Sequence, residues 1–330
     1  MSLPDGREIA MARKKDVEIQ TRMTIKASLK KYWQLYLLLL VPLVYFFVFR
    51  YAPMEYILTA FKKYKIGVSV WDMDWAVNKK KETDAFFYFK QAFGDNNFLK
   101  ALKNTVVLNL LDLVVGFPAP IIFALIINEL VFTKFKKVVQ TIAYMPHFLS
   151  WVIIYSLSLK LFATDDGIVN MIIQNLGGSA VPFLNDESLW VVTYILLGVW
   201  QNFGWGSIVY LAAIAGINPE LYEAASVDGA GRFTKMWHIT LPGIKPTIVV
   251  LLIMNLGGIL GGGFDRPFAM QNPLVLDMAE VISTFVYKTG IKNLKFSLTT
   301  AVGLFQSIVN LFFLLTANWI SRKLGERGIW

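Results

Sequence analysis

The sequence contains no cysteine, only two histidines and few charged side chains. Asp, Glu, Lys and Arg make up 17% of its 330 residues, whereas a soluble domain usually has about 25%. Without cysteine, the chain has no disulfides, no thiolate metal ligands and no thiol nucleophile. The histidines, His147 and His238, belong to no His-Glu-x-x-His pattern and lie in different predicted regions. We therefore predict no catalytic residues, no metal site and no enzymatic activity for the chain by itself.

The sequence also lacks the loop with which ATP-driven proteins typically bind phosphate. That loop has the pattern G-x-x-x-x-G-K-[ST], and the chain contains neither Gly-Lys-Ser nor Gly-Lys-Thr. If ATP drives this protein, a separate subunit must bind the nucleotide. We expect no cofactor in this chain.

Hydrophobic and aromatic residues are abundant, at 55% and 15% of the chain. This composition predicts an integral membrane protein whose aromatic side chains line two lipid–water interfaces. The formal net charge of +9 could indicate a nucleic-acid partner. The basic residues are scattered through tails and loops, however, so we expect contacts with membrane lipid and no nucleic acid.

Hydropathy predicts an all-α, polytopic fold with six transmembrane helices, each near the roughly 20 residues that a bilayer requires. A basic segment, residues 1–31, precedes one transmembrane domain, residues 32–330. The first span resembles a signal sequence, but it is long enough to cross the membrane and no small-residue cleavage site follows it. The predicted spans are residues 32–54, 104–128, 137–162, 189–214, 245–265 and 297–320.

The distribution of Lys and Arg places the N and C termini in the cytosol. The basic link at 131–137 then lies inside, and the link at 163–188, which has no Lys or Arg, lies outside. Residues 55–103 form an extracellular loop although they contain nine lysines. The lysine-rich part of that loop, residues 76–103, matches no motif that would assign it a role. The polar loop at 215–244 lies in the cytosol.

This cytosolic loop carries the signals of two short helices. Asn218 can cap the first helix, Pro219 suits its first position, and Gly229 suits the left-handed conformation that ends it. The sequence RFTKMWHIT predicts a second helix, which we expect to end at Leu241–Pro242 because the residue before proline avoids helical angles. Two short helices around a glycine corner predict a protrusion that another protein can approach.

The loop matches the pattern E-A-A-x3-G-x9-I-x-L-P at every fixed position. The letters EAA alone would suit an ordinary interhelical loop, but the full spacing is far more specific. It resembles the EAA motif of membrane subunits of binding-protein-dependent ABC importers. That resemblance implies that the first short helix is a coupling helix that docks on an ATP-binding subunit. The residues implied in ATPase coupling are Glu223, Ala224, Ala225, Asp228, Gly229, Ile239, Leu241 and Pro242.

Other stretches resemble carbohydrate-uptake permeases, in particular the LplB-like/YtcP-like polysaccharide permeases. They are residues 104–130, 144–154, 204–233 and 261–275. The resemblance implies the type I ABC importer permease fold, a bacterial plasma membrane location, and import of oligosaccharides or polysaccharide fragments. It also implies a heterodimer with a second homologous permease, two ATP-binding subunits that hold ATP and Mg, and an extracellular sugar-binding protein.

A sugar path needs aromatic faces for the apolar side of the ring, and amides or carboxylates for the hydroxyls. The fourth and fifth predicted spans offer both, together with a glycine run at 257–263 that would suit a broken helix lining a cavity. Interface anchoring and close helix packing remain alternative explanations for each of these residues. The candidates are Trp200, Gln201, Asn202, Trp205, Tyr210, Asn255, Phe264 and Asp265.

The alternative function is an ion-coupled secondary sugar transporter. Such carriers place ionisable residues inside the membrane, and Asp112 in the second predicted span could be a proton site. Asp112 could instead be a structural acid that neighbouring polar groups satisfy. A membrane-bound sensor or scaffold would have no need of a coupling loop.

Overall fold

The computed structural model describes residues 25–78, 80–326, 328 and 329. In these residues the regular structure is helical; they contain no β-strand and only two isolated bridges, Lys62–Trp75 and Val77–Thr83. The prediction of an all-α fold is confirmed. The chain divides into two units, Met1–Leu58 and Thr59–Trp330.

The described residues of the first unit form one long helical segment, which runs on to the start of the second unit. Residues Ser28–Ala60 are long and apolar enough to cross a bilayer, and they include the predicted first span. Residues 1–24 of the predicted basic segment lie outside the described residues. The elements are α2 (Ile25–Phe46), a π-helical turn η1 (Phe47–Tyr51) and a 3-10 segment η2 (Ala52–Ala60).

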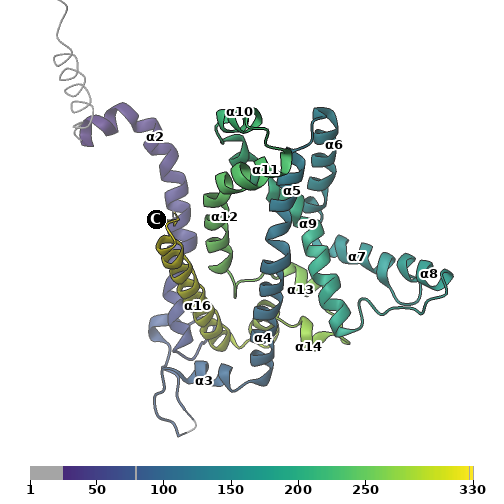
Figure 1. Cartoon of the computed structure of the whole chain (residues 1–330). Helices are drawn as coiled ribbons and strands as arrows, with labels where there is room; N and C mark the ends of the chain where they lie inside the picture. Colours follow the sequence, from purple (N-terminus) through teal and green to yellow (C-terminus); the bar gives the residue numbers. More distant parts are fainter. Residues whose placement is uncertain (1–24, 79, 327, 330) are drawn as a thin grey trace, which may run out of the picture. The chain divides into compact units, whose positions relative to one another are not determined.

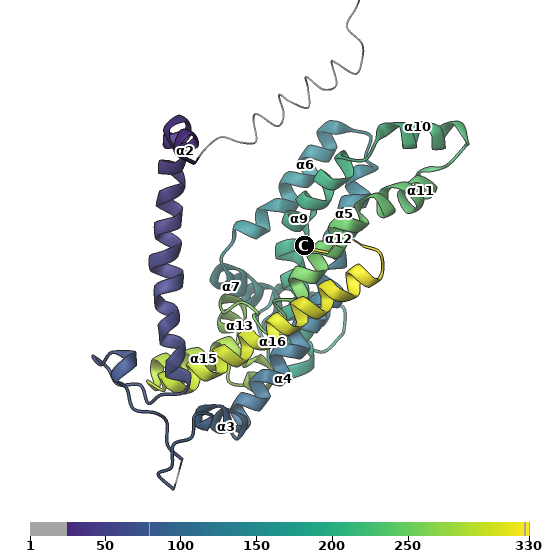
Figure 2. The ribbon, with the colours of Figure 1, turned by 90° about the vertical axis from the view of Figure 1, so that its left-hand side faces the viewer.

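The second unit is built around α9, a helix of 29 residues that packs against α5, α6 and α12 (Figure 1, Figure 2). Small residues allow the close packing: a Cβ at Gly204 would lie 2.0 Å from the carbonyl oxygen of Ala143 in α6. The long helices are α4 (Asn96–Leu111), α5 (Pro118–Asn128), α9 (Glu187–Ala215), α12 (Leu241–Leu256) and α16 (Phe296–Lys323).

Shorter elements connect these helices. A π-helical turn, η4, joins α4 to α5, and another, η6, joins α11 to α12. The shorter elements are η3 (Val70–Asp72), α3 (Phe87–Phe93), η4 (Asp112–Gly116), α6 (Thr133–Tyr144), η5 (Met145–Phe148), α7 (Trp151–Phe162), α8 (Ile168–Asn175), α10 (Pro219–Val227), α11 (Arg232–Lys235), η6 (Met236–Thr240), α13 (Asp265–Met270), α14 (Leu276–Ala279), α15 (Ile282–Val286) and η7 (Tyr287–Lys292).

Four helical segments of the described chain are long and apolar enough to span a membrane, and a bent fifth, α6 with α7, would make five. α9 is not among them, because polar residues such as Gln201, Asn202 and Ser207 interrupt its apolar sequence. At about 1.5 Å per residue it is nevertheless more than long enough to cross a bilayer. The count of six crossings and the orientation of the termini stay predictions.

The third predicted span, 137–162, is not one straight helix. α6 and α7 meet at 105°. Pro146 lies in the 3-10 turn between them, Leu149 is extended, and the Ser150 hydroxyl caps α7 by accepting from the N–H of Ile153. Proline is typical of a helix end, and a serine cap is typical of a helix start. The prediction of one span missed both because the stretch is hydrophobic throughout.

The fifth predicted span also differs, at both of its ends. We expected the second loop helix to end at Leu241–Pro242, but α11, η6 and α12 run on without a break. Pro242 directly follows the π-helical turn η6, in which the N–H of Leu241 bonds to the carbonyl of Met236, five residues back. The regular pattern of helical hydrogen bonds is therefore already shifted at the point where proline lacks an N–H. At the other end, α12 stops at Leu256 and the predicted span to residue 265 continues as the non-helical glycine run.

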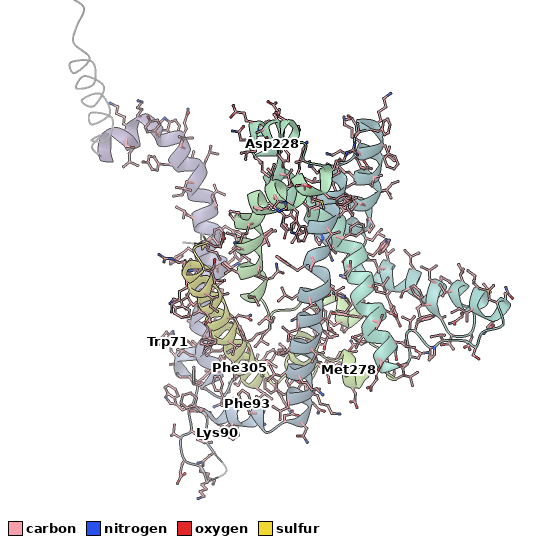
Figure 3. The ribbon with its side chains drawn as sticks, in the orientation of Figure 1. Trp71, Lys90, Phe93, Asp228, Met278 and Phe305 are labelled. Carbon is pink, nitrogen blue, oxygen red and sulfur yellow. The ribbon has the colours of Figure 1, made fainter. Side chains whose placement is uncertain are left out.

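The loop that carries the EAA motif, residues 215–244 (the coupling loop below), and the lysine-rich segment lie at opposite ends of the second unit. Asp228 is at one end, and Lys90 and Phe93 are at the other (Figure 3). Two lysines there have acidic partners. Lys90 pairs with Asp84 of the same segment, and Lys100 pairs with Asp277, each at 2.9 Å. These carboxylates neutralise part of the positive charge at this end of the unit.

Asn170 fixes the segment from α7 to α9, and its loss should destabilise the protein. The side chain is fully buried; its amide donates to the carbonyls of Ala163 and Val181 and accepts from the N–H of Val181. Each buried group left unpaired costs about 1–3 kcal/mol. We expect Asn170→Ala to lower the thermal unfolding midpoint of the purified protein in detergent, measured by scanning fluorimetry. The control is Gln174→Ala, at an exposed position of the same helix; equal midpoints for the two variants would contradict this role.

Candidate functional site

The first helix of the EAA loop, α10, is defined at both ends by the residues that the sequence indicated. The Asn218 side chain accepts from the N–H of Glu220, and Pro219 begins the helix. At the other end, Gly229 has a φ of +78°. The N–H of Gly229 bonds to the carbonyl of Ser226, and the N–H of Ala230 bonds to the carbonyl of Ala225. This pair of bonds is a Schellman motif, which requires the left-handed residue.

The motif residues divide into a surface set and a packing set. Glu223, Ala224, Asp228, Gly229 and Pro242 are exposed. The half-buried residues are Ala225, Ile239 and Leu241. Leu241 packs against a buried cluster that contains residues of α5, α9 and α12. The exposed set therefore presents a surface, while the other set anchors it to the long helices.

The two short helices are tied together by polar contacts. The hydroxyls of Tyr222 and Thr240 lie 3.0 Å apart, and Lys235 Nζ donates to Ser226 Oγ at 2.5 Å. Exposed apolar side chains surround them, with Val227 at 89% and Phe233 at 83% of full exposure. α10 and α11 thus form one linked protrusion at one end of the domain, with both apolar and acidic side chains on its surface.

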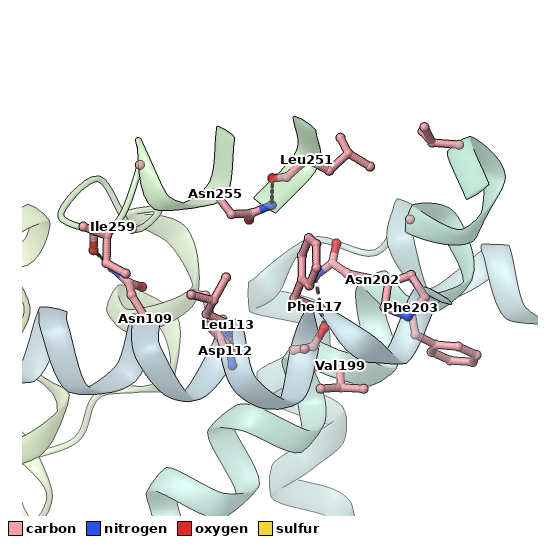
Figure 4. Close-up of a pocket in the computed structure, with 18 of the residues that line it drawn as sticks. Asn109, Asp112, Leu113, Phe117, Val199, Asn202, Phe203, Leu251, Asn255 and Ile259 are labelled. Atoms are coloured by element: carbon pink, nitrogen blue, oxygen red, sulfur yellow. Dashed lines mark hydrogen bonds and ion pairs between the residues drawn. The ribbon is translucent and has the colours of Figure 1, made fainter. Parts of the chain in front are cut away.

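A cavity of about 470 Å³ lies between α4–η4–α5, α9, α12 and the glycine run (Figure 4). Its size falls in the range of roughly 300–1,000 Å³ that is usual for small-molecule sites. The polar side chains at its wall include Asn109 and Asp112 from one side, Asn202 from α9 and Asn255 from α12. Aromatic and aliphatic residues complete it: Leu113, Phe117, Phe203, Tyr210, Leu251 and Ile259.

A second cavity of about 210 Å³ adjoins the first. Its other lining residues include Thr105, Leu108, Tyr194, Asp265 and Ser283. Both cavities share the following residues, which are polar or glycine: Asn109, Asp112, Asn202, Gly262 and Arg266. Asn109 donates to the carbonyl of Ile259 at 2.6 Å and so holds the glycine run against α4.

An ion pair lies between the two cavities. Arg266 Nη1 donates to Asp112 Oδ2 at 2.7 Å, and Nη2 donates to the carbonyl of Tyr194. The guanidinium also lies 3.6 Å from the centroid of the Tyr194 ring, a cation–π contact. Asp112 thus has a basic partner, which favours the structural acid over the proton site.

Gly198 makes room for this arginine. A Cβ at Gly198 would lie 2.4 Å from the central carbon of the guanidinium, so a side chain there would displace the guanidinium from this position. Trp151 of α7 covers another side, with its ring 5.2 Å from the guanidinium. Residues of η4, α7 and α9 therefore fix Arg266 together.

The sequence-predicted path residues fall into three groups. Asn202, Tyr210 and Asn255 line the larger cavity, and Asp265 lines the smaller one. Trp200 lines a separate cavity of about 270 Å³ with Phe123 and Phe203. Three residues line neither the larger nor the smaller cavity: Gln201, Trp205 and Phe264. Gln201 is buried and donates to the carbonyl of Leu149, where α6 and α7 meet.

His147 is a neighbour of this site that sequence reasoning left without a role. Its Nδ1 lies 3.1 Å from Asn202 Oδ1, and its ring stacks on Trp205 at 4.8 Å with an interplanar angle of 2°. Sequence reasoning also gave Asn109 and Gly198 no role. Their position within otherwise apolar helices was the one sequence feature that could have marked them as candidates for this site. In the described part of the chain, no group of three or more His, Asp or Glu side chains could hold a metal.

Comparisons with known proteins agree with this geometry. A family model described as "Binding-protein-dependent transport system inner membrane component" matches residues 97–326. Protein LplB of Bacillus subtilis (strain 168) is 42% identical over 303 residues, which cover 92% of this chain and 93% of that protein. The polygalacturonan/rhamnogalacturonan transport system permease protein YteP of the same organism is 43% identical, over 95% of this chain and 94% of that protein.

A solved structure is equally similar. It is the crystal structure of a bacterial ABC transporter involved in the import of the acidic polysaccharide alginate. One of its chains has 39% identity and a TM-score of 0.80, and the match covers 91% of this chain and 98% of that one. The extent of the family match and of these similarities shows that the chain belongs to the binding-protein-dependent transport system inner membrane components, the permease subunits of ABC importers.

Proposed function

We propose that this permease imports oligosaccharides or polysaccharide fragments across a bacterial plasma membrane. The observation that carries the proposal is a cavity with amide, carboxylate and aromatic walls on the same helices that end in the EAA loop. Amides suit sugar hydroxyls and aromatic faces suit the apolar side of a sugar ring. The names of the relatives support the same substrate class: one is a polygalacturonan/rhamnogalacturonan permease, and another transports alginate.

We further propose that the chain has no ATPase site of its own and works with partners. Two ATP-binding subunits would hold ATP and Mg, and a second, homologous permease would complete a heterodimer. An extracellular sugar-binding protein would deliver the substrate. In support, an alginate transporter 38% identical in one chain was crystallised with an alginate pentasaccharide-bound periplasmic protein.

The link from the ATP-binding subunits to the cavity runs through continuous helix. α10 is joined to α9 by the short turn at Gly216–Asn218, and its Tyr222 contacts Thr240 of η6. From η6 the chain stays helical through α12 to Leu256, next to Asn255 in the cavity wall. A force applied to α10 therefore reaches two walls of the cavity.

The proposed function predicts ATP-dependent uptake of saccharides. The test is uptake of a panel of labelled oligosaccharides, including uronate-rich fragments, by proteoliposomes that hold the complete complex. We expect at least one oligosaccharide to accumulate with ATP and not without it, and an ionophore to have no effect. Uptake that needs an ion gradient and no ATP would show the alternative, a secondary transporter.

Glu223→Arg should impair coupling to the ATP-binding subunits, because it reverses an exposed charge at the centre of α10. We expect reduced copurification of those subunits and loss of most uptake, with normal membrane insertion. Asp166→Arg is the control, since this exposed carboxylate follows α7, far from the loop in sequence. Normal copurification and uptake with Glu223→Arg would contradict the coupling role.

A matched pair of glycines tests the shape of the loop. A Cβ meets nothing within 4 Å at either Gly229 or Gly231, but only Gly229 has a positive φ. A side chain in the left-handed region costs about 1–2 kcal/mol. We expect Gly229→Leu to reduce ATP-driven uptake several-fold, through loss of the helix end, and Gly231→Leu to leave it near normal. Equal effects of the two variants would exclude a conformational cause.

Asn202→Ala should reduce uptake with assembly intact, because Asn202 lines both cavities and contacts His147. Loss of one good hydrogen bond to substrate, about 1 kcal/mol, corresponds to a roughly fivefold rise in KM. The measurement is the concentration dependence of uptake, beside copurification of the ATP-binding subunits. Leu196→Ala on α9 is the control, since Leu196 is exposed and lines neither cavity. An unchanged KM with Asn202→Ala would remove this residue from the path.

A further inference from the structure

The two cavities lie one after the other along the domain. Along α4 and α5, Thr105 and Leu108 line the smaller cavity, whereas Phe117 and Pro120 line the larger one. α9 runs the same way: Tyr194 lines the smaller cavity, and Gly206, Val209 and Tyr210 line the larger one. All three helices run toward the end of the domain that holds α10 (Figure 1). The larger cavity is therefore on the coupling-loop side, and the smaller cavity is on the opposite side.

The Asp112–Arg266 pair stands at the boundary between them. Both residues line both cavities, and their side chains are 31% and 13% exposed. Arg266 is the one basic side chain that lines either cavity within the described chain. Its Nε is buried and has no hydrogen-bond partner among the described residues, so the guanidinium keeps a spare donor. Paired charges inside a membrane domain commonly mark the route of a substrate.

We propose that the Asp112–Arg266 ion pair is the gate of the substrate path in this subunit, closed in the present conformation. This proposal rests on the proposed function, because it locates the closed point of the same path. The pair holds the wall formed by η4 against the segment that follows the glycine run. A sugar chain that passes from the smaller to the larger cavity must part these two side chains or displace one of them.

Each of the two charges lies in or close behind a segment of irregular backbone. Asp112 begins η4, and its carbonyl accepts from the N–H of Phe117, five residues on, instead of the usual four. Arg266 follows the glycine run, in which Gly263 has open space at its Cβ position. By contrast, α9 holds the guanidinium through Tyr194 and the space at Gly198. Opening therefore moves Asp112 on η4, and Arg266 stays with α9.

The absence of cysteine from the chain allows a direct test. Single cysteines would be introduced by Val209→Cys in the larger cavity and Ser283→Cys in the smaller one. In membrane vesicles with the complete complex, a charged, membrane-impermeant maleimide is applied from the side of the coupling loop, without nucleotide. We expect Val209→Cys to react and Ser283→Cys to be protected. Asp112→Asn should then raise the reaction rate of Ser283→Cys about tenfold, the ratio that corresponds to about 1.4 kcal/mol.

Two further variants separate the gate from a general loosening of the fold. Asp277→Asn removes the carboxylate of the Lys100–Asp277 ion pair, which lines neither cavity, and should leave both rates unchanged. Asp112→Glu keeps the charge and should keep Ser283→Cys protected. A rise at Val209→Cys as large as that at Ser283→Cys would mean unfolding and would overturn the gate.

The proposal also fails if Ser283→Cys reacts as fast as Val209→Cys in the otherwise unaltered chain, a comparison that does not depend on the folding of any Asp112 variant. It fails equally if Asp112→Asn leaves the protection unchanged. Because labelling requires no sugar, these results are independent of whether saccharide uptake is found.

Discussion

The position of one guanidinium determines the shape of the membrane cavity. Arg266 donates to Asp112 and to the Tyr194 carbonyl, and it occupies space that only a glycine at position 198 leaves free. Taking two charges out of water is costly, and their attraction repays that cost only when the geometry is good and other polar groups join in. The contacts of Arg266 with α9, α7 and η4 supply those conditions. Without this arginine, the wall that the two cavities share would lose its ion pair.

Packing constraints of this kind also explain the small and polar residues on the buried side of α9. These buried residues include Gly198, Gln201, Gly204 and Ser207. Gly198 makes room for Arg266, whereas Ser207 Oγ donates to the carbonyl of Gly204 within α9 itself. Two of them have plain structural partners: Gly204 admits the backbone of α6, and Gln201 holds the carbonyl of Leu149. α9 therefore forms the packing centre of the domain, where hydropathy is a poor guide to the course of the helix.

A feature of this structure was predictable when the residues that determine it lie close together in the sequence. Both ends of α10 were predictable, because the cap at Asn218 and the left-handed Gly229 act on neighbours within a few residues. The break between α6 and α7 was missed, since Pro146 lies in a stretch whose average hydropathy is that of a span. The partner of Asp112 was beyond reach: Arg266 is 154 residues away, and no local pattern connects the two.

Rigid and deformable segments alternate along the route from the coupling loop to the cavity, and this order decides where movement occurs. The Tyr222 hydroxyl of α10 contacts Thr240, the last residue of η6, and regular α-helix continues from Leu241 to Leu256. Beyond Leu256 come the glycine run and then Arg266. On the facing wall, α5 runs back from the coupling-loop end to η4, where Asp112 lies. Regular helices transmit a displacement with little loss, whereas a π-helical turn and a glycine run absorb it. A displacement of α10 is therefore expressed at the level of the ion pair, where the two irregular segments meet.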